Sequence, residues 1–64
     1  METYTREQLL RGEGFFSSGE YTVIYRRKDG KYITAGRHDL PGRDLEIVGG
    51  GHLQPNGLPC IHWC

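Results

Sequence analysis

The sequence predicts a small α+β domain that is mostly β. It consists of a short N-terminal helix and a small three- to four-stranded antiparallel sheet, or a partly open SH3-like barrel. Three observations predict this class. The chain of 64 residues has room for one small domain, residues 1–64. Residues 20–37 are rich in β-branched and aromatic side chains on either side of a turn signal. A capping motif at Thr5 marks the start of a helix.

The predicted helix begins after Thr5 and is one or two turns long. The Thr5 hydroxyl is placed to accept from the backbone of Gln8, whose side chain reaches back to Thr5. Gly12 is a natural C-terminal stop. A helix this short persists only by packing Leu9 and Leu10 on other elements.

Residues 12–20 are expected to form a loop from which Phe15 or Phe16 fills part of the core. Residues 20–37 are expected to form a β-hairpin, for which two registers exist. A two-residue turn pairs Lys28 with Lys31, whereas a three-residue loop with Gly30 left-handed pairs Tyr25 with Ile33. The second register is preferred because it gathers one apolar face, which a slip by one residue would scramble. That face consists of Tyr21, Val23, Tyr25, Ile33 and Ala35.

The sequence of residues 40–64 predicts turns and short strands. Residues 40–43 are expected to form a turn, and residues 44–48 a third strand with Leu45 and Ile47 pointing inward. The glycine run at 49–51, followed by His52, reads as a flexible break. An Asn-Gly turn follows, and residues 60–64 form either a last strand or a helix that begins at Pro59.

Composition limits the classes of function. The formal net charge is zero and the pI is about 6.8, so the chain as a whole carries no strong field for nucleic acid. No apolar run approaches the roughly 18 residues of a membrane span. The first residues lack the basic and apolar regions of a signal peptide, so we expect a cytoplasmic protein with reduced thiols and no membrane partner.

The C-terminal residues carry the metal-binding hypothesis. Thiolate and imidazole groups are the ligands that zinc prefers. On a strand, Cys60 and Cys64 lie about 13 Å apart at about 3.3 Å per residue, so neighbours two apart are the feasible pairs. The alternatives are a redox or disulfide role, and a plain structural role for Cys60 in the core. The cofactor is therefore none, or zinc, and the candidate ligands are His52, Cys60, His62 and Cys64.

The hairpin carries a cluster of cations with tyrosines beside it. Such a surface suits an acidic protein partner or a nucleic acid, and it also suits a solvated sheet edge with no partner. The expected partner-binding residues are Arg26, Arg27, Lys31, Tyr32 and Arg37.

No catalytic motif stands out. Ser17, Ser18 and Thr34 lie outside any nucleophile-elbow pattern, and we expect a protein that is not an enzyme. The predicted function is a small non-catalytic binding module. It would be an adaptor or inhibitor-like accessory protein, of a size found in bacteria and phages, acting on a macromolecular partner through the hairpin. A zinc-stapled domain and a nucleic-acid-binding small barrel are the alternatives, and a homo-oligomer completed through an open sheet edge is a further one.

Overall fold

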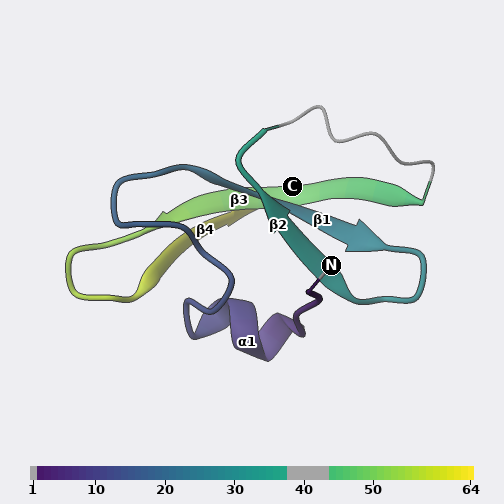
Figure 1. The fold of residues 1–64 in the computed structure, drawn as a ribbon, viewed down its shortest axis with the longest axis horizontal. Coiled ribbons are helices and arrows are strands. Elements are labelled where there is room, and N and C mark those ends of the chain that lie inside the picture. Colours follow the sequence, from purple (N-terminus) through teal and green to yellow (C-terminus); the bar gives the residue numbers. More distant parts are fainter. Residues whose placement is uncertain (1, 38–43) are drawn as a thin grey trace.

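The computed structural model of the chain describes residues 2–37 and 44–64. Within them, one short helix accompanies a single four-stranded antiparallel sheet with the strand order β2-β1-β3-β4 (Figure 1). The sheet is open, which confirms the mostly β class but not the SH3-like barrel. The turn expected at 40–43 lies outside the described residues. The elements are α1 (Arg6–Leu10), β1 (Thr22–Arg27), β2 (Tyr32–Ala35), β3 (Leu45–Leu53) and β4 (Pro59–Trp63).

The helix α1 begins as its capping motif predicts. The Thr5 hydroxyl accepts from the Gln8 amide at 3.2 Å, and the Thr5 amide donates to Gln8 Oε1 at 2.8 Å. Gly12 follows the helix with a φ of +89°, and its amide donates to the Leu9 carbonyl. Leu9 is fully buried, whereas Leu10 is half exposed. One leucine therefore docks the helix on the sheet.

The hairpin has the three-residue register. Tyr25 pairs with Ile33 across β1 and β2. The Arg27 amide donates to the Lys31 carbonyl at 2.7 Å and closes the loop. Gly30 has a φ of +87°, in the left-handed region that this loop type requires.

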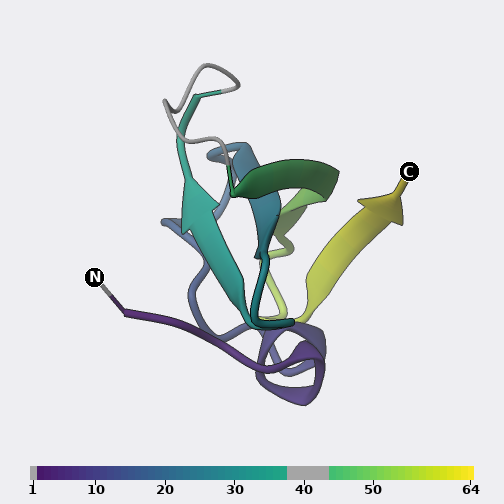
Figure 2. The ribbon, with the colours of Figure 1, turned by 90° about the vertical axis from the view of Figure 1, so that its right-hand side faces the viewer.

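The central strand β1 is buried on both faces. One face carries the predicted apolar cluster of Val23, Tyr25 and Ile33, against which Ala35 and Leu45 pack. The other face, which we call the helix face, buries Thr22 and Ile24. Figure 2 shows α1 lying below the sheet, between β2 and β4. Sequence alternation identified the first face and missed the second.

The segment after α1 is held on the helix face by two hydrogen bonds to threonine side chains. The Phe16 amide donates to Thr22 Oγ1 at 3.3 Å, and Thr34 Oγ1 donates to the Gly14 carbonyl at 2.7 Å. Phe16 itself stays exposed and Phe15 half-buried, so the expectation that one of them fills the core is wrong. Leu9 supplies the fully buried side chain instead.

Two other predicted inward positions are exposed. Tyr21 precedes β1 and is half exposed, and Ile47 is also exposed. The pairing of β1 with β3 shifts between Ile24 and Tyr25, where one extra residue of β3 makes a bulge. Leu45 nevertheless packs on the core as expected.

The glycine run is not a flexible break, because β3 continues through it to Leu53. A Cβ on Gly49 would lie 2.6 Å from the His62 carbonyl oxygen, and a Cβ on Gly51 would overlap the Cys60 carbonyl oxygen. A Cβ on Gly50 would overlap the Tyr21 hydroxyl on the opposite face. All three glycines are buried and allow close approach of neighbouring groups.

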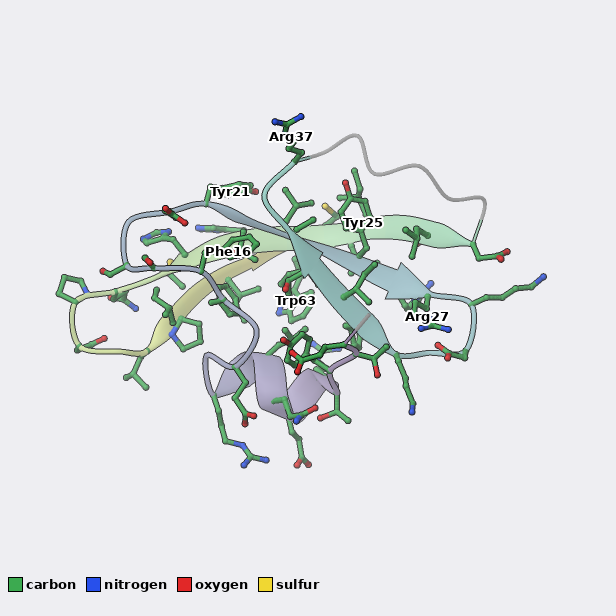
Figure 3. The ribbon with its side chains drawn as sticks, viewed as in Figure 1. Phe16, Tyr21, Tyr25, Arg27, Arg37 and Trp63 are labelled. Carbon is green, nitrogen blue, oxygen red and sulfur yellow. The ribbon has the colours of Figure 1, made fainter. Side chains whose placement is uncertain are left out.

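The C-terminal residues form the strand β4, so the helical alternative is wrong. The Gln54 amide donates to the Leu58 carbonyl at 2.9 Å across the predicted Asn-Gly turn, where Gly57 has a φ of +85°. Trp63 then reaches the helix face, where its ring lies edge-on to that of Tyr32 with centroids 6.2 Å apart. The Arg6 guanidinium lies 4.8 Å from the centre of the Trp63 ring. Trp63 therefore contacts both α1 and β2 (Figure 3).

We predict that Gly51→Ala lowers the free energy of unfolding by about 2 kcal/mol or more, because its Cβ needs space that the Cys60 carbonyl occupies. The matched control is Gly36→Ala, whose Cβ would meet only the Phe16 ring at 3.8 Å. The control is expected to change stability by no more than about 0.5 kcal/mol. Urea denaturation followed by circular dichroism measures both values. Equal stability of the two variants would contradict the close packing of β3 on β4.

Candidate functional site

A hollow of about 760 Å³ lies at the turn end of the β1–β2 hairpin. It forms because β1 pairs with β3, which brings the start of β3 beside the hairpin turn. Arg26 lies opposite Glu46 in this pairing, and Arg27 lies opposite Leu45. We call this the hairpin groove, and it is lined by Arg26, Arg27, Lys28, Gly30, Asp44, Leu45 and Glu46.

The charges of the hairpin groove are mixed in sign. Arg26 Nη2 lies 3.4 Å from Glu46 Oε1, and Arg27 Nη2 lies 3.5 Å from Asp29 Oδ2. All four side chains are exposed by more than 40%, so each pair contributes no more than about 1 kcal/mol. No salt bridge is found for Lys28 among the described residues. The groove therefore presents cations and carboxylates whose ion pairs can be broken at a small cost in free energy.

The structure brings together only part of the predicted partner-binding set. Arg26 and Arg27 line the hairpin groove, and Lys31 follows the same turn, where its amide donates to Asp29 Oδ1 at 3.1 Å. Tyr32 is the cross-strand partner of Arg26, but it does not line the groove, and its ring faces Trp63. Arg37 follows the far end of β2, away from Arg27 (Figure 3).

The sequence did not predict that Asp44 and Glu46 would line the hairpin groove. Glu46 lies on β3 and Asp44 immediately precedes that strand, and the pairing of β1 with β3 places this segment beside the hairpin. The charge alternation of Asp44-Leu45-Glu46 was visible in the sequence. It carried no information on which strand would lie beside it.

Three of the candidate metal ligands, His52, Cys60 and His62, lie on one face of β3 and β4. Cys60 Sγ lies 3.7 Å from His62 Nε2, and His52 is the cross-strand partner of Cys60. Cys64 follows the end of β4 and is exposed. Among residues 2–37 and 44–64, no three His, Cys, Asp or Glu side chains are grouped so that they could hold a metal ion. Zinc binding stays a prediction.

Two of the three hydroxyl groups considered as nucleophiles, those of Ser18 and Thr34, take part in local structure. Ser18 Oγ donates to the Leu53 carbonyl at 3.2 Å, and Thr34 bonds Gly14 as described above. The sequence also offers His38 as a candidate base and Asp39 as a candidate carboxylate, and both lie outside the described residues. The expectation that the protein is not an enzyme stays a prediction.

In the part of the chain that the structure describes, no helix is both long and apolar enough to cross a membrane.

No protein-family model matches this chain, and no curated protein or solved structure is significantly similar to it.

One titratable group near the N-terminus has a shifted pKa. The Tyr4 hydroxyl donates to Glu2 Oε2 at 2.8 Å, and this hydrogen bond raises the pKa of Tyr4 above 10, with smaller contributions from burial and from nearby carboxylates. Because the folded state favours the protonated phenol, this contribution to stability is complete below pH 10. It is lost as the pH rises through the pKa of the folded state.

We predict that Glu2→Gln lowers the pKa of Tyr4, because a neutral amide no longer favours the protonated phenol. NMR titration of the tyrosine ring carbons between about pH 8 and 12, around the usual tyrosine pKa of about 10, measures this change. Glu7→Gln, a change on α1 that removes the same charge, is expected to leave Tyr4 unchanged. An identical Tyr4 titration in the wild type and in Glu2→Gln would show that Glu2 has no role.

Proposed function

We propose that the protein is a small non-catalytic binding module, an adaptor or inhibitor-like accessory protein, whose contact surface is the hairpin groove. The observation that carries this proposal is a hollow of about 760 Å³ whose walls combine cationic and anionic side chains from two chain segments. Both cysteines are free thiols, which is consistent with a reducing compartment such as the cytoplasm.

A protein partner is favoured over a nucleic acid by the signs of these charges. Asp44 and Glu46 stand beside the cations and would repel phosphate groups. Tyr32, the ring expected to stack on bases, already packs against Trp63. A protein surface that carries charges of both signs is the better complement.

The existing ion pairs do not oppose binding. Arg26 with Glu46 and Arg27 with Asp29 are exposed pairs at 3.4 and 3.5 Å. Such pairs contribute between zero and about 1 kcal/mol, so a partner can replace them with interactions that become buried on binding. Lys28 lines the groove as an exposed ammonium group that such a partner can pair.

We predict that Lys28→Glu lowers partner recovery at least about fivefold, since the loss of one close charge contact in an interface costs about 1 kcal/mol or more. The experiment is a quantitative pull-down from a cell lysate with the purified protein as bait. Arg11→Glu is the matched control, because it changes the net charge equally and lies beyond the groove lining, just after α1.

Equal recovery by the two variants would reject the hairpin groove as the contact surface. If the recovered partner is a nucleic acid, its affinity falls steeply between about 50 and 200 mM salt, and the assignment to a protein partner is then wrong. Circular dichroism of both variants establishes that each is folded.

A further inference from the structure

A second surface, away from the hairpin groove, has a different chemistry. Two hollows of about 480 and 450 Å³ share the side chain of Phe16. The first is lined by Glu2, Tyr4, Gly14, Phe15, Phe16 and Thr34. The second is lined by Phe16, Glu20, Tyr21 and Gly36. We call the two together the aromatic surface. Figure 3 shows Phe16 and Tyr21 near each other, well to the left of Arg27.

The aromatic surface keeps large rings in contact with water. Phe16 is 38% exposed and Tyr21 is 51% exposed, although this short chain has few apolar side chains with which to build a core. Scattered exposed apolar residues are ordinary, but grouped aromatic rings that line adjoining hollows are typical of a binding site.

Hydrogen bonds and packing hold the first hollow in shape. The Tyr4 ring lies against Gly14, where a Cβ would stand 3.0 Å from two ring carbons. The Gly14 carbonyl is fixed by Thr34 Oγ1 at 2.7 Å, and the Tyr4 hydroxyl holds the Glu2 carboxylate at 2.8 Å. A carboxylate thus lies beside an aromatic ring in the absence of a ligand.

The charge of the lining selects the ligand. Glu2 contributes a carboxylate to one hollow and Glu20 contributes a carboxylate to the other, while neither lining includes a lysine or arginine among the described residues. Aromatic faces and carboxylates together attract a cation, and a planar guanidinium both stacks on rings and pairs with a carboxylate. The protein uses the first of these contacts itself, where Arg6 lies over Trp63.

We propose that the aromatic surface binds arginine side chains of a basic peptide segment in a protein partner. One guanidinium stacks on Phe16 and pairs with Glu20, and the next pairs with Glu2 beside Tyr4. This inference goes beyond the proposed function, because it concerns another surface and a partner segment that is cationic. Its failure would leave the hairpin groove unaffected.

The test uses the full chain labelled with ¹⁵N and the peptide acetyl-Gly-Arg-Arg-Gly-amide. Amide shifts are followed by NMR up to about 10 mM peptide, ten times the dissociation constant of a millimolar contact. We expect saturable shifts at residues 14–16, 20, 21 and 36, and weaker binding as salt rises. The control peptide replaces both arginines with citrulline, which has nearly the same shape without the charge, and it is expected to cause no saturable shift.

Two pairs of variants separate the stacking contact from the charge. Phe16→Ala is expected to weaken binding about threefold or more, whereas Leu58→Ala, which removes another exposed apolar side chain, leaves binding unchanged. Glu20→Gln is expected to weaken binding about twofold to threefold, whereas Glu7→Gln on α1 has no effect.

Three outcomes would overturn the proposal. They are an absence of saturable shifts at 10 mM peptide, equal binding of the citrulline peptide, and unchanged affinity in Phe16→Ala. A fourth outcome concerns a second copy of the chain. If the peptide-free spectrum already changes at these residues as the protein is concentrated, the occupant is a second copy of the chain, and the assignment to a partner peptide is wrong.

Discussion

The close approach of β4 to β3 at Gly49 and Gly51 is the constraint on which the rest of the structure depends. Hydrogen atoms stand where side chains would be, so the carbonyl groups of Cys60 and His62 occupy that space. This approach carries Trp63 onto the helix face, where it meets Tyr32 and Arg6. A larger residue at Gly49 or Gly51 would meet these carbonyl oxygens, so β4 would have to move away from β3. The lack of a side chain at these two positions therefore allows β4 to pair with β3 from Pro59 to Trp63.

Burial of β1 on both faces explains how so small a chain forms a core. Val23 and Tyr25 pack with β2 and the start of β3, while Ile24 lies on the helix face. Helix α1 has five residues, too few to persist alone, and it remains because Leu9 is fully buried. Two surfaces of the sheet then carry different chemistry. The turn end of the β1–β2 hairpin holds ion pairs of mixed sign, whereas exposed rings and carboxylates gather along β2 and beside the start of β1.

Local rules predicted what depends on neighbours in sequence. The Thr5 capping box, the Gly30 loop and the pairing of Tyr25 with Ile33 each follow from a few adjacent residues. These rules do not predict contacts between residues that are far apart in the sequence. The glycine run predicts a flexible break when it is taken alone, because its partners Ile61, His62 and Trp63 lie on the following strand. At the candidate site, adjacency placed Arg26 and Arg27 together, but Glu46 joined them only through strand pairing. Alternation put Tyr32 on the other face from Ile33 without revealing that Trp63 covers it.

The position of Trp63 has a practical consequence for spectroscopy. It is the single tryptophan of the chain, and its indole stands where α1, β2 and β4 meet. Its fluorescence emission therefore originates from one known place, and a change in wavelength or intensity signals that the helix has left the sheet. The domain thus carries an intrinsic optical reporter of helix docking that needs no attached dye.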